Sequence, residues 1–534
     1  MTRKRGLYWA TSTTMRFNSF SKTAILDTQT VNHAGAKADA LSPEMELYSA
    51  VVTTMLADSF YEKADARLTR IQALVGQVNP LFVAQLAVYT REHMYLRTAP
   101  IVLIGELAKI HNGDDLVSRT IARVVQRPDE ITELLAYYQK TNARTEAKKL
   151  NRLSKQVQRG LALSFNRFDA YQFAKYDRAA FGRATAVRLR DALFLVHPKA
   201  KDEAQQLVFN HITSRTLTTP YTWETELSAL GQQDFKTEAA KKMAAQAKWH
   251  ELIDSARLGY MATLRNLRNM LEADIDTAHL KTVCRTLANE RAVQKAKQFP
   301  FRFLAAYREI SVLAEQYQRQ VSLINHALEE AIRISTANLS GFDSDTSVVV
   351  ACDVSSSMQK PVSAKSKVLL YDIGLLLGML LKTRSKNVVS GMFGDRWKIV
   401  DLPATGVLAN VDAFYKREGE VGYSTNGYLV LDDLIKRRYA ADKVMFFTDV
   451  QLWDSTTNNL SNQNTVQAKW RQYKQLFPNA KLYLFDLAGH GKTPIHPESN
   501  DVFLIAGWSD KVFDVLQAIE NGEDSLAGVQ GIMI

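Results

Sequence analysis

The chain has 534 residues, several times the length of an average domain, so we expect more than one hydrophobic core. Hydrophobic residues make up 46% and charged residues 23% of the chain, with 24 Gly and 12 Pro, which excludes a disordered or fibrous protein. Two cysteines are too few for a disulfide framework, and no apolar run suits a secretory signal or a membrane span. A cytoplasmic protein without membrane association is expected.

The formal net charge of +11 is unevenly distributed along the sequence. Residues 351–534 hold 20 basic and 20 acidic residues, so the whole excess lies before them. Residues 141–200 alone carry 13 Lys and Arg against 4 Asp and Glu. Such a one-sided density favours a polyanion-binding surface over a solvated helix face, and nucleic acid is the leading candidate partner.

From about Leu41 to Asn338 the sequence predicts an array of helices. A cap residue or a proline suited to the first helical turn occurs at Ser42-Pro43, Asn79-Pro80 and Arg127-Pro128, and each is followed by amphipathic sequence. Strand-like alternation is absent from this part. Stacked helix pairs of the HEAT type, as a superhelix or a closed ring, are the architecture we expect, with extended surfaces that suit a large ligand better than a small substrate.

The composition changes around residues 339–343, and from there short apolar runs alternate with helical stretches. Near-continuous apolar runs of this length are typical of buried parallel strands. The predicted strands are Ser347–Cys352, Asn387–Phe393, Lys443–Thr448, Lys481–Phe485 and Asp501–Ile505. The pattern predicts a doubly wound α/β domain, beginning near residue 343, whose ligands bind at the carboxyl ends of the strands.

Oxygen-bearing side chains follow two of these strands. A DxSxS pattern comes directly after the first strand, a Thr-Asp pair ends the third, and a glycine-flanked loop before a helix adds a hydroxyl. The donors are Asp353, Ser355, Ser357, Thr425 and Asp449, with Ser424 as the competing hydroxyl in the loop. Oxygen ligands of this kind suit a hard divalent cation, Mg²⁺ above all.

Other chemistries fit the sequence less well. The segment Gly489–Thr493 looks like the end of a phosphate loop, but Asp486 stands where that loop needs a glycine. Cys352 lies on a predicted buried strand and is interpreted as a small core residue rather than a nucleophile. No histidine lies in a zinc-hydrolase spacing, and no nucleophile and base are assembled, so we expect a protein that is not an enzyme.

The five oxygen donors resemble the metal-ion-dependent adhesion site of von Willebrand factor A domains. Together with the helical array, the chain resembles the TROVE-domain Ro autoantigen family, including its bacterial members, over nearly its full length. Supporting segments are Thr30–Ala36, Arg97–Pro100, Phe299–Phe303 and Asp449–Trp453. The resemblance implies an N-terminal arm (residues 1–22), a HEAT-like helical ring (23–342) and a von Willebrand factor A domain (343–534) that closes it.

The resemblance also implies a function. Ro proteins bind small noncoding Y RNAs on a basic outer surface and single-stranded ends of misfolded RNAs in a central hole, in RNA quality control and stress survival. Bacterial relatives also work with exoribonucleases. By position, the Y RNA surface falls on Lys175, Arg178 and His197. The resemblance assigns additional electrostatic attraction of the Y RNA to Arg159, Arg183 and Arg188. We expect a monomer that binds Y-like RNA without transforming it.

Two points stay open in the sequence. The alternative function is a metal-dependent protein-adhesion scaffold without an RNA ligand, whose helical array binds an acidic protein. In related A domains the bound metal keeps a position open for a partner's carboxylate, although here the metal could equally be structural. Aromatic residues near the basic region could stack on unpaired bases or could serve the helix core. They are Phe165, Phe168, Tyr171, Phe173 and Tyr176.

Overall fold

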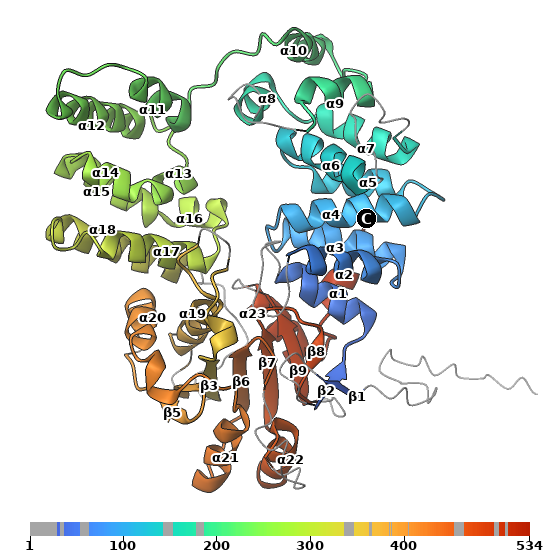
Figure 1. The fold of residues 1–534 in the computed structure, drawn as a ribbon, viewed down its shortest axis with the longest axis vertical. Coiled ribbons are helices and arrows are strands. Elements are labelled where there is room, and N and C mark those ends of the chain that lie inside the picture. Colours follow the sequence, from blue (N-terminus) through green and yellow to red (C-terminus); the bar gives the residue numbers. More distant parts are fainter. Residues whose placement is uncertain are drawn as a thin grey trace, which may run out of the picture.

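The computed structural model describes residues 29–31, 37–53, 64–141, 153–177, 186–335, 346–362, 366–383, 385, 387–403, 405–452, 464–495, 501–507 and 511–534. Two runs of stacked helices and one sheet domain make up this part of the chain (Figure 1). Within it, no helix combines the length and the apolar character that crossing a bilayer requires.

The first run of helices stacks away from the sheet domain, along one side of the molecule (Figure 1). It comprises α1 (Pro43–Val52), α2 (Ala64–Val75), α3 (Pro80–Glu92), α4 (Thr98–Ile110), α5 (Leu116–Val124), α6 (Pro128–Thr141), α7 (Lys155–Phe165), α8 (Ala170–Tyr176), α9 (Leu189–Val196) and α10 (Glu203–Ser214). The side chains of Ser42 and Asn79 accept hydrogen bonds from the first turns of α1 and α3, as their sequence predicts. The apolar stripe of α6 is buried at Ile131, Leu134 and Leu135.

The second run returns along the other side toward the sheet domain (Figure 1). It comprises α11 (Trp223–Gly231), α12 (Glu238–Asp254), α13 (Tyr260–Arg265), α14 (Leu267–Glu272), α15 (Thr277–Leu287), α16 (Glu290–Ala296), α17 (Pro300–Ser311) and α18 (Gln318–Ser335). The two runs and the sheet domain thus follow a closed, ring-like path. The prediction of a helical array followed by an α/β domain is confirmed.

The sheet domain is doubly wound, with strand order β5-β4-β3-β6-β7-β9 and only the edge strand β5 antiparallel. Its strands are β3 (Ser347–Asp353), β4 (Asn387–Phe393), β5 (Trp397–Ile399), β6 (Lys443–Thr448), β7 (Lys481–Asp486) and β9 (Val502–Ala506). Its helices are α19 (Leu370–Lys382), α20 (Val407–Tyr415), α21 (Tyr428–Arg437), α22 (Val466–Leu476), α23 (Val512–Glu520) and α24 (Ala527–Gln530), with short 3-10 turns at Ser356–Gln359 and Glu418–Val421. One apolar core holds α19, α20 and α23, and a second, on the other face, holds α21 and α22.

The strand order switches at β3. The next two strands in the sequence, β4 and β5, lie on one side of it, and the later strands β6, β7 and β9 lie on the other. Strand β3 pairs in parallel with β4 on one side and with β6 on the other, so Cys352 lies opposite both Met392 and Phe447. A crevice for ligands is expected outside the carboxyl ends of strands at such a switch point. Cys352 is fully buried beneath it, in agreement with its prediction as a core residue.

A small second sheet was missed by the sequence analysis. Strands β1 (Gln29–Val31), β2 (Lys37–Ala40) and β8 (Lys492–Thr493) form it in antiparallel order. The glycine-rich segment before β8 is a packing turn: Gly489 and Gly491 have φ of 67° and 78° and lie against α1, where any side chain would collide. Strands as short as these carry too little alternation to stand out in a sequence.

The sheet domain contacts both ends of the helical array. One apolar core runs from α12 through α18 into the sheet domain, and Arg308 of α17 forms two hydrogen bonds, of 2.5 and 2.7 Å, with the buried Asp372 of α19. At the other end, Tyr48 donates to the carbonyl of Ala506, and Arg119 of α5 donates to the carbonyl of Ile534. The predicted N-terminal arm and the boundary near residue 343 lie outside the described residues.

Candidate functional site

Two buried carboxylates lie at the switch point of the sheet. Asp353 is the last residue of β3 and Asp449 directly follows β6, and both are 1% exposed. The backbone N–H of Ser355 donates to Oδ1 of Asp353 at 2.8 Å, and the hydroxyl of Thr448 donates to its Oδ2 at 2.6 Å. These two hydrogen bonds hold the carboxylate of Asp353 in one orientation, as a preorganised ion-binding site requires.

Two serine hydroxyls lie beside Asp353. Ser355 and Ser357 are buried, and their Oγ atoms are 3.1 Å apart, whereas the intervening Ser356 is exposed. The backbone N–H of Ser356 donates to the carbonyl of Tyr423 at 3.2 Å. This bond ties the DxSxS turn to the glycine-flanked loop that carries the predicted threonine.

Close backbone packing holds that loop against the end of β4. Gly422 has a φ of 75°, and a side chain there would collide with Asp395, which accepts from the N–H of Ser424 at 3.1 Å. Thr425 is buried and Ser424 is exposed. Of the two hydroxyls that the sequence left in competition, only that of Thr425 belongs to a buried residue.

Asp449 carries the most informative oxygen of this edge. Its Oδ1 accepts from the N–H of Gln451 at 3.0 Å, while its Oδ2 is buried without a hydrogen-bond partner. Val450 between them has a φ of 61°, a left-handed conformation that is costly for a β-branched residue. A strained turn that leaves a buried carboxylate oxygen unsatisfied is typical of a site that awaits a ligand.

The two carboxylates lie close enough to disfavour each other's ionisation. Burial raises the pKa of Asp353 to about 6, against the hydrogen bonds from Thr448 and Ser355. Burial and the neighbouring charge of Asp353 raise the pKa of Asp449 to about 7. Neither forms an ion pair with a basic side chain in the described part of the chain. Buried negative charge with hydroxyls around it fits a hard divalent cation bound through oxygen.

The predicted cationic surface lies on α7, α8 and α9, in the part of the first run that lies away from the sheet domain (Figure 1). Arg159, Lys175, Arg188 and His197 are all exposed there. Arg188 precedes α9 and His197 caps its end with a φ of 48°. Arg178 and Arg183, the other two predicted contacts, lie outside the described residues. Within the described ranges, none of the four described side chains forms an ion pair with a carboxylate.

Most of the aromatic residues near this surface belong to the core. Phe165, Phe168 and Phe173 are buried and pack on one another, so they are not available to an RNA base. Tyr171 is different, since 49% of it is exposed. The ammonium group of Lys175 lies 5.7 Å from its ring centroid. Among the candidates, this tyrosine offers the most open ring face for stacking.

Tyr171 also lines a cavity of about 710 Å³ that the sequence did not reveal. The cavity lies where the first run of helices passes to the second, and its wall includes His211, residues 216–221 and Arg257. The guanidinium of Arg257 lies 5.5 Å from the ring centroid of Tyr221. The walls come from α8, α10, the connecting segment and the turn after α12, which no local motif links. The cavity thus combines aromatic rings, a cation and threonine hydroxyls.

Comparison with known proteins agrees with this architecture. The TROVE domain family matches residues 48–226 and 215–367, most of the helical array. The chain belongs to the TROVE domain family. It is 23% identical over 349 residues to "Telomerase protein component 1" of Rattus norvegicus and 24% identical over 349 residues to its counterpart in Mus musculus. These matches cover 52% of this chain but only 13% of either relative.

A solved structure shows the same fold across both parts of this TROVE protein. The crystal structure of the Deinococcus radiodurans Ro (RSR) protein superposes with a TM-score of 0.58 at 17% identity, covering 90% of this chain and all of the other. The predicted helical ring with a von Willebrand factor A-like domain is therefore confirmed as the fold. Family and fold therefore agree with the resemblance that the sequence suggested.

Proposed function

We propose that this TROVE protein binds small structured, Y-like RNA on the surface of α7–α9 and unpaired RNA ends beside it, without transforming them. The observation that carries the proposal is the set of exposed cations on these helices, which no carboxylate in the described part of the chain neutralises. Its biological setting would be cytoplasmic RNA quality control under stress, with the protein as a monomer and with an exoribonuclease as a candidate partner.

The electrostatics of the surface support a phosphate ligand. Arg159 lies on α7, and Arg188 directly precedes α9, which packs on α7. Lys175 lies on α8, whose Phe173 stacks on Phe165 of α7, so the three exposed cations come from neighbouring elements. Elsewhere, exposed cations are often paired, as Arg268 is with Glu272 and Glu309. Neutralising phosphates with unpaired cations releases counterions, which drives RNA association at low salt.

The cavity lined by Tyr171 supports the binding of unpaired bases. An exposed tyrosine ring can stack on any base, and the neighbouring Lys175 can reach the phosphate of the same nucleotide. Helical RNA cannot offer such a base, because its bases are stacked inside the duplex. A structured RNA on α7–α9 and a single-stranded end at Tyr171 would therefore use adjoining but separable contacts.

The oxygen-donor edge supports a bound Mg²⁺. Asp353, Ser355, Ser357, Thr425 and Asp449 would hold it, and the unsatisfied Oδ2 of Asp449 supports a donor role for that residue. A bound cation would offset the repulsion between the two carboxylates and orient a partner's carboxylate if one completes its coordination. Among the described residues, no nucleophile and base are assembled around this edge, so we assign the metal no catalytic step.

Recovery of RNA with the protein tests the proposal. The protein would be isolated from its native cell at mild salt, and any RNA that accompanies it would be sequenced. A dominant small structured RNA supports the proposal. Binding to that RNA should then be lost on exchanging Lys175→Glu together with Arg188→Glu, because both phosphate attraction and orientation are removed.

A matched control uses exposed cations on the second run of helices. Lys236→Glu together with Lys281→Glu makes the same change in net charge away from α7–α9 and should leave RNA affinity nearly intact. Equal losses of RNA affinity in the two double variants would show that net charge alone causes the effect, and would contradict the proposed RNA-binding surface. Both pairs are exposed, so folding should be unaffected.

A second function, that of a metal-dependent protein-adhesion scaffold, rests on the unsatisfied Oδ2 of Asp449. It predicts a stoichiometric protein in place of RNA in the same isolation, released by a chelator and by Asp353→Ala. Recovery of RNA whose binding ignores chelators would favour the first function.

A further inference from the structure

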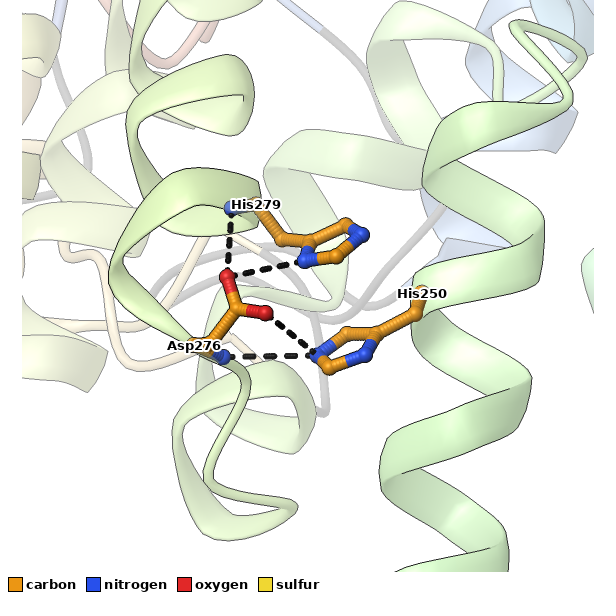
Figure 2. A group of neighbouring side chains, drawn as sticks. All are labelled: His250, Asp276 and His279. Carbon is orange, nitrogen blue, oxygen red and sulfur yellow. Dashed lines mark hydrogen bonds and ion pairs between the residues drawn. The ribbon is translucent and has the colours of Figure 1, made fainter.

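Two histidines and an aspartate converge between α12 and α15 (Figure 2). His250 lies in the last turns of α12, Asp276 caps the start of α15, and His279 lies in the first turn of α15. One ligand atom from each residue falls in a group whose members all lie within 4.8 Å of one another. The residues are separated by 26 and 3 positions, so no short motif marks them.

The nitrogen atoms that face Asp276 are poorly satisfied. Nδ1 of His279 is 2.8 Å from Oδ1 of Asp276, yet it is buried and makes no well-aligned hydrogen bond. Nε2 of His250 accepts a long bond, 3.3 Å, from the backbone N–H of Asp276 and lies 3.8 Å from Oδ2. As an acceptor, Nε2 of His250 carries a lone pair and no proton, which is the state that binds a metal.

The start of α15 orients the carboxylate. Oδ1 of Asp276 accepts from the backbone N–H of His279 at 2.9 Å. A second carboxylate, Asp254, places Oδ2 3.4 Å from Nε2 of His279. It stands on the other side of the imidazole, where such a partner orients a metal-binding histidine.

The spacing suits a tetrahedral transition-metal ion. Zinc bonds of about 2.0–2.1 Å place neighbouring ligand atoms about 3.3 Å apart. One ligand atom from each of the three residues lies within 4.8 Å of the others, a spacing that small side-chain rotations reduce to this value. Two imidazoles and one carboxylate select zinc and its neighbours over magnesium. We propose that His250, Asp276 and His279 form a transition-metal site, with Zn²⁺ as its natural occupant, that fastens α12 to α15.

Loading this site must change the stacking of the two rings. The imidazoles are parallel, with centroids 3.7 Å apart and planes 2° apart, and each presents a nitrogen to Asp276 (Figure 2). A shared ion needs converging nitrogens, so the rings must tilt apart on coordination. Their side chains are 24% and 18% exposed, and the solvent-facing side leaves room for this movement and for a water as fourth ligand.

The site would act on the architecture and not on a reaction. Helices α12 and α15 belong to successive layers of the second run and pack directly on each other. A metal bridging them would oppose the separation of these layers, as structural zinc does in small domains. The inference is independent of the RNA proposal, because none of the three residues belongs to the surface of α7–α9.

The test titrates the purified full chain, freed of metal by a chelator, with Zn²⁺ and with Co²⁺. We expect one tight site, an intense visible absorption of bound Co²⁺ that reports tetrahedral nitrogen and oxygen ligands, and a higher melting temperature with Zn²⁺. His279→Gln and Asp276→Asn should each lower the Zn²⁺ affinity by about 100-fold. His326→Gln, an exposed histidine of α18, is the matched control and should bind as the parent does.

Two outcomes would overturn the proposal: a parent chain that takes up no Zn²⁺ at micromolar concentrations, or variants that retain its affinity. Asp353→Ala separates this site from the oxygen-donor edge, since it should leave Zn²⁺ binding unchanged. If His279→Gln fails to fold, His250→Gln supplies the same test from α12. Zn²⁺ binding that follows Asp353 instead would assign the ion to the sheet domain.

Discussion

The oxygen-donor edge of the sheet domain and the cationic surface of α7–α9 handle charge in opposite ways. At the edge, Asp353 and Asp449 are buried together with no cation beside them in the described residues, so their charge is held at a cost. On the surface, Arg159, Lys175 and Arg188 are exposed, and water screens each of them. At the edge, the free energy of ligand binding would therefore depend on a few buried atoms. On the surface, it would be shared among many exposed cations.

This difference predicts how each site responds to substitution. Loss of one buried donor removes a ligand from a fixed geometry, so single changes at the edge should act strongly. Loss of one exposed cation removes one screened contact of several, so single changes on α7–α9 should act weakly and add up.

The largest effect is expected for Asp353→Ala. This carboxylate is the one donor that strand β3 itself positions, so its loss should abolish Mg²⁺ binding in a calorimetric titration. Ser356→Ala is the matched control, because that serine lies within the same turn but is exposed. Mg²⁺ binding that survives Asp353→Ala would show that the edge is not the metal site.

The next effect concerns the stability of the metal-free protein. The folded-state pKa values of about 6 and about 7 exceed the ordinary value for Asp, so the folded state holds more protons than the unfolded state between about pH 4 and 7. The contribution of these two groups to stability is therefore fully present at low pH and falls as the pH rises through that range. Asp449→Asn should remove most of this fall and stabilise the metal-free protein at pH 8 by about 2–3 kcal/mol.

Urea unfolding at pH 5 and pH 8, with and without Mg²⁺, measures this effect. In the parent chain Mg²⁺ should stabilise more at pH 8 than at pH 5, since the ion competes with protons. In the Asp449→Asn variant the dependence on Mg²⁺ should be small, and the pH dependence should shrink to the part that the burial of Asp353 contributes. A parent chain that gains stability as the pH rises over this range would contradict the repulsion between the two carboxylates.

The contrast also explains what the sequence could predict. The placement of Asp353 and Asp449 could be predicted because the ends of apolar strands can be located in a sequence, and both residues lie at such ends. Helix starts such as Ser42-Pro43 could be predicted equally well, because helix capping depends on neighbouring residues in the sequence. The two-sheet arrangement was not: the very short strands around β8 form only through tertiary contacts.

The prediction of the ligand sites was also limited, because they depend on contacts between residues far apart in the sequence. Whether Tyr171 faced the core or solvent depended on packing between α6, α7 and α8, which periodicity does not resolve. The cavity beside it and the cluster of His250, Asp276 and His279 join elements that are neighbours only in space. Side chains of these types could be listed from the sequence, but their convergence is a property of the fold.

A moderate effect is expected for Tyr171→Ala. Stacking of a base on an exposed aromatic ring contributes about 1–3 kcal/mol, so the affinity for a short single-stranded oligonucleotide should fall by about 10- to 100-fold. Tyr171→Phe keeps the ring and should retain most of the affinity, which separates stacking from the hydroxyl. Fluorescence anisotropy with an oligonucleotide and with a duplex of equal length measures both, and the duplex should be insensitive to either change.

The smallest effect, and the finest test of the contrast, is expected for Arg159→Gln. This arginine is exposed and has no carboxylate partner in the part of the chain that the structure describes, so its contribution to RNA binding is one screened phosphate contact. Its loss should weaken every structured RNA by a similar small factor and should lower the slope of log affinity against log salt by about 1. The salt series must therefore be measured for two unrelated RNAs. Equal changes in both slopes identify a phosphate contact, and a loss confined to one RNA would show that Arg159 reads sequence or shape instead.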